Sequence, residues 1–297
     1  MSLRNLQILT AIARKGSFAA AAEHLGLTQS AISLQIKNLE EELGVRLFER
    51  TGRSPKLNAN GRLVLERAQE ILAIYDGIRD ELAPSGMIRG VLTLGVVPTV
   101  ITGPLPPVLG RLRRRHEDLR VKLLSGLSTD LVRQVEEGNL DAALTTEPPY
   151  AVAPQYEWRA YDMEPFFVAA PKGTEATGVE MLFERFAFVR FDKTAWAGAL
   201  VDGQLLAQGI HPRDVMEFDS LEAALSLVEQ GLGIAVVPLD KRRIRQAGKH
   251  FSLTPFGTPQ LTRRVGMYQK RRHPRHALTE LILTELCREC GYITATP

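Results

Sequence analysis

The sequence predicts three parts in order: a small all-α winged helix-turn-helix domain, a long linker helix, and an α/β domain built from two Rossmann-like halves. Apolar residues recur at helical spacing in the first part and at a/d spacing in the second, whereas from Val91 onward apolar runs alternate with amphipathic helices. We place the boundaries at these changes of pattern: 1–58 for the winged helix-turn-helix domain, 59–90 for the linker helix and hinge, and 91–297 for the α/β domain, with half I at 91–162 and 267–297 and half II at 163–266.

Length, charge and cysteine content narrow the class of protein. The chain has 297 residues, of which 44% are hydrophobic, so it can fill the cores of two domains. The net charge of +3 indicates no particular partner, but residues 1–60 hold eight Lys and Arg against five Asp and Glu. Two cysteines cannot build a disulfide framework, and residues 1–20 lack a signal-peptide pattern. We therefore expect a cytoplasmic protein.

Residues 90–110 contain no charged side chain, and this segment is long enough for a membrane-spanning helix. Four Pro and four Gly interrupt the segment, and a spanning helix tolerates such residues poorly. We expect a buried strand followed by a loop, and no membrane partner.

Two helical patterns near the start of the chain meet at Gly26. A helix over 18–25 begins after Ser17, and the next helix begins after Thr28; both residues are favourable N-caps. A stripe of aliphatic residues follows at spacings of four, three and four: Ile32, Ile36, Leu39 and Leu43. Together with a helix over 3–14, these patterns predict a helix-turn-helix.

The opposite face of the helix that follows Thr28 is mostly polar. Its residues are Gln29, Ser30, Ser33, Leu34, Gln35, Lys37 and Asn38. Glutamine can form two hydrogen bonds with an adenine edge, hydroxyl groups can donate or accept, and a helix N-terminus attracts phosphate. This composition favours contact with a DNA groove. The alternative is a solvated face in a small helical bundle.

Residues 45–57 predict a two-stranded wing, because a Gly-Arg-Ser-Pro turn separates two short extended runs. The segment is basic, with Arg46, Arg50, Arg53 and Lys56. Such side chains can bind phosphates or enter a minor groove. A basic hairpin can also be an ordinary solvated surface.

Residues 17–53, "SFAAAAEHLGLTQSAISLQIKNLEEELGVRLFERTGR", resemble the DNA-binding domain of the LysR-type transcriptional regulators. The resemblance implies DNA contacts from the third helix and the wing: Thr28, Gln29, Ser30, Ser33, Leu34, Gln35, Lys37, Arg50 and Arg53. The chain departs from the family pattern at two of these positions. Many members have proline in place of Ser30 and arginine in place of Leu34, and Asn58 replaces a threonine that caps the next helix.

Residues 59–83 predict one long helix with a narrow apolar seam. The seam consists of Val64, Ala68, Ile71, Tyr75, Ile78 and Leu82. Such a seam suits pairing with a second helix, although an amphipathic helix packed on its own domain would show a similar pattern. LysR-type regulators dimerise through a helix at this place, so the resemblance implies a homodimer or homotetramer. The segment 83–90 then serves as a hinge.

The α/β domain predicts a ligand cleft between its halves, because ligands bind beyond the carboxyl ends of strands in such sheets. Thr99, Ser128 and Thr129 follow predicted strands and could donate hydrogen bonds to an anion. Capping of the following helices is an alternative role for each of them.

The segments "LVRQVEEGNLDAALTT" (131–146) and "SLEAALSLVEQGLGIAVVP" (220–238) resemble the effector-binding domain of the same family, which is similar in fold to periplasmic solute-binding proteins. The resemblance implies effector contacts from Thr99, Val100, Ser128, Thr129, Thr146, Thr194 and Asp219. Arg190, Lys193 and Trp196 suggest an anionic or aromatic effector, unless they lie on the surface.

These observations predict a sequence-specific DNA-binding transcriptional regulator controlled by a small-molecule effector. Its partners are double-stranded DNA and the effector, and RNA polymerase is compatible with this function. The C-x-x-C pair Cys287 and Cys290 lacks further zinc ligands at matching spacing, and no nucleophile–base pair stands out, so we expect no metal, no cofactor and no enzymatic activity. The competing interpretation is a cytoplasmic solute-binding protein with a non-regulatory N-terminal helical domain.

Overall fold

The computed structural model describes residues 2–49, 55–81, 90–175, 178–218, 220–273 and 275–292, with the backbone alone at 73, 76–81 and 90. The chain divides into two compact units. Unit 1 comprises Met1–Arg89 and Arg271–Ala277, and unit 2 comprises Gly90–Lys270 and Leu278–Pro297.

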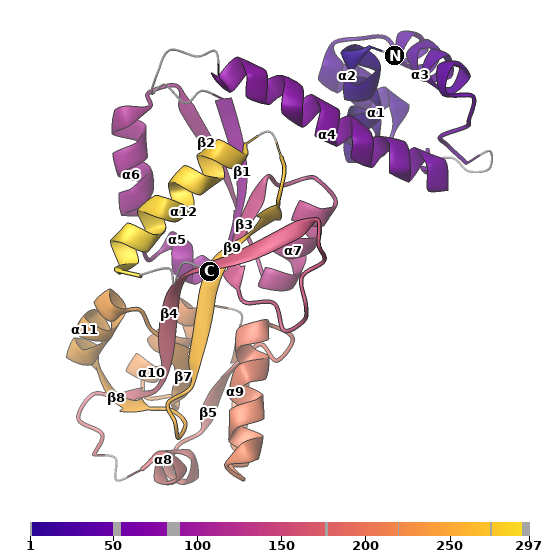
Figure 1. Cartoon of the computed structure of the whole chain (residues 1–297). Coiled ribbons are helices and arrows are strands. Elements are labelled where there is room, and N and C mark those ends of the chain that lie inside the picture. Colours follow the sequence, from indigo (N-terminus) through magenta and orange to yellow (C-terminus); the bar gives the residue numbers. More distant parts are fainter. Residues whose placement is uncertain are drawn as a thin grey trace. The chain divides into compact units, whose positions relative to one another are not determined.

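Unit 1 is built from the short helices α1 (Leu3–Lys15), α2 (Phe18–Leu25) and α3 (Gln29–Leu43) and the longer helix α4 (Ala59–Glu81) (Figure 1). Local sequence sets the ends of α1, α2 and α3. The side chains of Ser17 and Thr28 accept hydrogen bonds from the first turns of α2 and α3, as predicted. The glycines that follow α1, α2 and α3 adopt left-handed conformations that favour glycine: Gly16, Gly26 and Gly44.

The core of unit 1 lies where α1, α2, α3 and α4 meet. Its buried side chains include Leu6, Ile8, Leu9, Ile12, Ala21, Ile32, Ile36, Leu39, Leu47 and Ala68. The predicted stripe of α3 is correct for its first three residues, but Leu43 is 37% exposed in the last helical turn. After α3, Phe48 and Leu57 form an antiparallel bridge at the base of the wing.

The predicted seam of α4 needs correction at its N-terminal end. Ala68 is 1% exposed and Val64 packs against the same core, so α4 uses these residues to cover its own unit. The apolar side chains that α4 leaves exposed are Leu63, Ile71, Ile74 and Tyr75. The side chain of Ile78 and the whole of Leu82 lie outside the described residues.

In the described part of unit 2, seven strands form one sheet in the order β2-β1-β3-β9-β4-β7, with β8 pairing beside β4. The strands are β1 (Gly90–Val96), β2 (Leu119–Ser125), β3 (Ala142–Thr146), β4 (Tyr156–Pro171), β7 (Ala235–Pro238), β8 (Phe251–Pro255) and β9 (Thr262–Lys270). Strand β1 is parallel to β2 and β3, which confirms the predicted βαβαβ order of half I. A separate parallel pair, β5 (Phe188–Phe191) and β6 (Asp214–Phe218), belongs to half II.

Helices connect and cover these strands (Figure 1). They are α5 (Pro98–Ile101), α6 (Leu105–Arg115), α7 (Ser128–Glu136), α8 (Val179–Arg185), α9 (Trp196–Ala207), α10 (Leu221–Glu229), α11 (Lys241–His250) and α12 (His276–Cys290). With the bounds given above, half I holds β1–β3, α5–α7 and α12, half II holds β5–β8 and α8–α11, and β4 and β9 extend through both.

Strand β4 is longer than the sequence predicts and runs through both halves. Only its last part, 165–171, has a continuous apolar pattern. The first part, 156–165, pairs with β9, and the last part pairs with β7 and β8. The first part mixes polar and apolar residues, and one of its apolar side chains, Trp158, lies under a charged group: the Arg264 Cζ atom is 5.1 Å from the ring centre.

We expect Gly61→Ala to destabilise unit 1. A Cβ atom at Gly61 would lie 2.0 Å from the carbonyl oxygen of Leu47, so the backbone must shift. Overpacking of this kind costs about 1–3 kcal/mol, and thermal unfolding followed by circular dichroism should show a lower midpoint. The matched control is Gly203→Ala in α9, where a Cβ atom meets no heavy atom within 4 Å. If both variants unfold at the parent's midpoint, the close approach of α4 to Leu47 is wrong.

Candidate functional site

The exposed face of α3 is a mostly polar surface above a buried stripe. Gln29, Ser30, Ser33 and Lys37 are exposed, whereas Ile32 faces the core. The Thr28 hydroxyl accepts the N–H of Ala31 at 3.2 Å and lies 3.1 Å from the Ser30 hydroxyl, so it fixes the start of the helix. The face therefore presents side-chain amides and hydroxyls on a well-defined helix end.

Two further residues on this face differ in character. Leu34 is 56% exposed, which is unusual for a large aliphatic side chain and suits contact with a thymine methyl group. Lys37 lies 3.5 Å from Glu41 on the next turn, and both side chains are more than 60% exposed. Solvent screens such a pair strongly, so Lys37 stays available to an anion. Gln35 is half-buried beside them.

The base of the wing is held by a buried carboxylate. Glu40 accepts the N–H of Leu47 at 2.7 Å and pairs with the Arg46 guanidinium at 2.8 Å. Arg46 therefore has a structural role, which the sequence did not indicate. Arg50 and Arg53, the predicted contacts in the wing, lie outside the described residues.

In unit 2, a cavity lies between half I and half II at the carboxyl ends of β1, β2 and β3. Half I contributes Thr99, Ser128 and Thr146, three of the predicted effector residues. Half II contributes Phe191, Ala195, Trp196, Ala197 and Leu221. The cavity volume is about 30 Å³, so in this conformation it has room for little more than one water molecule.

One member of a buried ion pair, Arg263, lines this cavity. Arg263 on β9 donates from Nε to Glu164 Oε2 on β4 at 2.8 Å, and both side chains are 4% exposed. The Arg263 Nη2 group also donates to the Thr99 hydroxyl at 2.8 Å. The Ser128 hydroxyl accepts the backbone N–H of Thr146 at 3.2 Å. The wall thus contains hydroxyl groups and a guanidinium in fixed positions.

A second small cavity continues from the first into half II. It shares Thr99, Phe191, Ala197, Leu221 and Arg263 with the first cavity, and its remaining lining is apolar: Phe166, Val189, Val201, Ala224, Ala235, Val236, Val237 and Pro238. The combined site is polar toward half I and apolar toward half II.

Several predicted effector residues lie away from this site. Val100 is fully buried, and its N–H already donates to the Val97 carbonyl at 3.0 Å. Thr194 is exposed and donates to the Asp192 carboxylate at 2.7 Å, which caps the local turn. Thr129 is exposed outside the cavity lining. Asp219 lies outside the described residues.

The three residues that suggested an anionic or aromatic effector have different outcomes. Trp196 lines the cavity and contacts Tyr150 edge-to-face, with ring centres 5.8 Å apart. Arg190 is buried and forms two hydrogen bonds with Asp214, at 2.7 and 2.9 Å, so it stabilises the β5–β6 pair instead. Lys193 lies 3.7 Å from the same carboxylate.

The sequence analysis missed Arg263 and Glu164. They stand 99 positions apart in strands whose pairing was not predicted. A weak signal was present, because an Arg-Arg pair at 263–264 interrupts a strand that is otherwise largely apolar.

The cysteine pair in α12, Cys287 and Cys290, consists of two half-buried free thiols. Burial raises the pKa of Cys287, and burial together with the neighbouring Asp162 carboxylate raises the pKa of Cys290 well above its ordinary value. Thiolates, which are the reactive and metal-binding form, are therefore disfavoured. In the described residues, no helix has the length and apolar character needed to cross a membrane.

Comparison with known families gives two matches that together span most of the chain. Residues 3–62 match the model described as bacterial regulatory helix-turn-helix protein, lysR family. Residues 85–291 match the model described as LysR substrate binding domain.

Individual proteins give the same relationship. The HTH-type transcriptional regulator CzcR of Bacillus anthracis is 31% identical over 255 residues, covering 84% of each chain. The HTH-type transcriptional regulator YofA of Bacillus subtilis (strain 168) is 30% identical over 240 residues, covering 80% of this chain and 81% of its own.

Solved structures share the fold at lower identity. A variant of full-length OxyR from Pseudomonas aeruginosa matches with a TM-score of 0.76 and 23% identity, over 100% of this chain and 99% of its own. Full-length CbnR complexed with its target DNA matches with a TM-score of 0.54 and 23% identity, over 98% of this chain and 100% of its own.

Proposed function

Because the chain belongs to the LysR family of effector-modulated, DNA-binding transcriptional regulators, we propose which of its residues bind DNA, pair the subunits and bind the effector. The family match over residues 3–62 leaves no support for the alternative of a solute-binding protein with a non-regulatory N-terminal domain. We further assign it to the cytoplasm, without catalytic activity and with RNA polymerase as a downstream partner.

DNA binding is assigned to the exposed face of α3 and to the wing. The proposed contacts are Thr28, Gln29, Ser30, Ser33, Leu34, Gln35, Lys37, Arg50 and Arg53. The observation that supports this assignment best is the burial pattern of α3, which holds amides and hydroxyls on a rigid face over buried Ile32 and Ile36. Gln29 and Ser33 suit base edges, Leu34 suits a thymine methyl group, and the cations suit phosphates.

Dimerisation is assigned to the face of α4 that unit 1 leaves uncovered. Ile71, Ile74 and Tyr75 are 36%, 69% and 41% exposed on consecutive turns of this helix. A second copy of α4 could bury these side chains and would place two copies of α3 for a two-fold symmetric site. Of the seam predicted from sequence, the proposed dimer contact keeps Ile71 and Tyr75, whereas Val64 and Ala68 pack into the core of unit 1.

The effector is assigned to the cavity between the halves of unit 2. Thr99, Ser128 and Arg263 supply polar groups, and the continuation into half II supplies an apolar pocket, so the site suits a small carboxylate with an apolar group. Since the cavity holds about 30 Å³, the halves or their side chains must move to admit such a molecule. This movement provides a physical link between effector binding and DNA binding.

We expect Gln29→Ala and Arg53→Ala to affect DNA binding in different ways. Loss of a bidentate base contact should reduce the preference for the true site by about 1–3 kcal/mol. Loss of a phosphate contact should weaken binding to all sequences and lower the salt slope by about one unit. Titrations of specific and random duplexes at several salt concentrations measure both quantities. If the two variants lose affinity equally on both duplexes with unchanged slopes, this division of roles is wrong.

We expect Ile71→Asp with Ile74→Asp to dissociate the dimer, because burying two carboxylates in an apolar contact costs several kcal/mol. Sedimentation velocity should show monomers, and operator binding should fall. Leu206→Asp is the matched control, since Leu206 is 75% exposed on α9, outside α4. A double variant that sediments as the parent does would assign the dimer contact elsewhere.

We expect Thr99→Val to weaken effector binding and to leave effector-free DNA affinity unchanged, because the hydroxyl lines the cavity and unit 1 binds the DNA. Thr129→Val is the control, as the same change at an exposed position outside the cavity. Small organic carboxylates can be screened by thermal shift and the binders measured by calorimetry. Equal affinity of parent and Thr99→Val would place the effector outside this cavity.

A further inference from the structure

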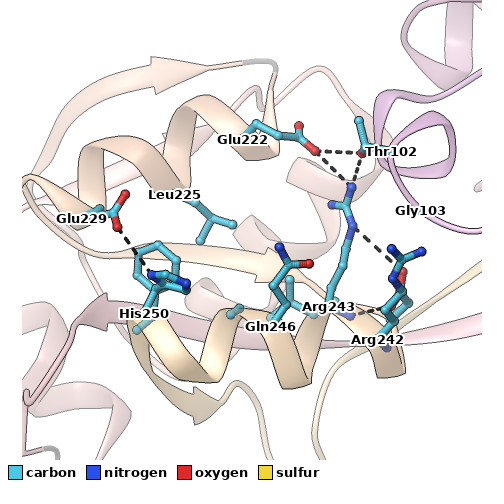
Figure 2. Close-up of a pocket in the computed structure, with 13 residues that line it drawn as sticks. Thr102, Gly103, Glu222, Leu225, Glu229, Arg242, Arg243, Gln246 and His250 are labelled. Atoms are coloured by element: carbon cyan, nitrogen blue, oxygen red, sulfur yellow. Dashed lines mark hydrogen bonds and ion pairs between the residues drawn. The ribbon is translucent and has the colours of Figure 1, made fainter.

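A larger cavity lies in unit 2, between α10 and α11, apart from the effector site. Its volume is about 410 Å³, which is within the range of small-molecule sites. The floor is apolar and consists of Leu225, Leu239, Ala247 and Phe251. Figure 2 shows Leu225 extending from α10 toward α11, with Gln246 between Arg243 and His250 on the opposite wall.

One end of this cavity is closed by an ionic network in which both halves take part. The Thr102 hydroxyl, just after α5 in half I, donates to Glu222 Oε1 at 2.8 Å, and Arg243 Nη2 donates to the same oxygen at 3.0 Å. Arg243 also donates to the Thr102 hydroxyl and lies 3.9 Å from Asp240. Burial by itself would raise the pKa of Glu222, but the hydrogen bonds from Thr102 and Arg243 lower it. Arg243 is therefore already paired with carboxylates within the protein.

The remaining polar groups are available to a ligand. Among the described residues, the side chains of Arg242 and Gln246 have no hydrogen-bond or ion-pair partner, although both line the cavity. At the far end, His250 Nδ1 and Glu229 Oε1 are 3.7 Å apart, and both side chains are more than half exposed. Helix α11 adds exposed cations at Lys241, Arg245 and Lys249, so the local potential favours an anion near Arg242.

We propose that this cavity is a second ligand site, which takes an aromatic or branched aliphatic carboxylate with its apolar body on the floor and its carboxylate at Arg242 and Gln246. The apolar floor excludes a purely polar anion such as phosphate, and the unpaired guanidinium favours the carboxylate over a neutral compound of the same shape. The Glu229 carboxylate at the far end fixes the orientation by repelling the charged group.

The full chain can be titrated calorimetrically with 2-naphthoate and with the neutral 2-naphthamide. Naphthoate should bind at least about tenfold more tightly than the amide, because a charge-assisted hydrogen bond contributes that much. The Arg242→Ala/Gln246→Ala double variant should lose about tenfold in naphthoate affinity, and Ala247→Phe should abolish binding by filling the floor. Arg245→Ala removes the same charge from α11 outside the cavity lining and should bind naphthoate as the parent does.

Three results would overturn the proposal. The first is that naphthoate shows no binding at ligand concentrations up to about 10 mM, which would also reveal a weak site with a millimolar Kd. The second is that Arg245→Ala loses as much naphthoate affinity as the double variant does, which would show that the overall charge of α11, and not the cavity, attracts the probe. The third is a loss in Thr99→Val with none in the double variant or in Ala247→Phe, which would place the probe in the effector site.

Discussion

The pairing of β4 with β9 is the constraint on which the arrangement of unit 2 depends. Strand β4 pairs with β9 from Tyr156 opposite Lys270 to Pro165 opposite Thr262, and then continues into half II to pair with β7 and β8. The two halves therefore share hydrogen-bonded backbone. The cavity to which we assign the effector lies beside these shared strands, because Arg263 of β9 lines it.

The buried pair of Arg263 and Glu164 lies near the end of this pairing, where the two residues are directly opposite each other on β9 and β4. A buried ion pair contributes little net stability compared with apolar residues, because both charges must be removed from water. The ion pair instead fixes the position of the Arg263 guanidinium, which also donates to the Thr99 hydroxyl at 2.8 Å. An anionic effector that binds Arg263 would compete with Glu164 for the guanidinium. Effector binding would in this way change the contact between β4, which carries Glu164, and β9, which carries Arg263.

Unit 1 depends on a comparable buried carboxylate. Glu40 lies on the core side of α3 and binds the backbone N–H of Leu47, so the direction of the chain after α3 is fixed. The base of the wing and the exposed face of α3 are thereby set relative to each other within one small core. With the DNA contacts proposed above, such rigidity would matter for base recognition, because the donors of Gln29 and the serines would have to match groove atoms to about 0.5 Å.

The sequence by itself determined the features that arise from near neighbours. The caps Ser17 and Thr28, the turn at Gly26, the buried stripe of α3 and the βαβαβ order of half I all follow from spacing and composition within about twenty residues. Thr99 and Ser128, which line the cavity between the halves, were singled out because strand ends of a parallel sheet meet at one edge, whereas Thr146 followed from the family resemblance alone.

Only the tertiary structure decided which face of α4 is covered, that β4 begins at Tyr156, and that Arg263 meets Glu164. Helix α11 and strand β8 were not predicted either, because α11 has few apolar residues among its cations, and Ala247 is the one residue of this fully described helix that is buried. Each of these outcomes depends on contacts between segments far apart in the chain. Local propensity assigns such contacts no energy, so spacing alone cannot reveal them.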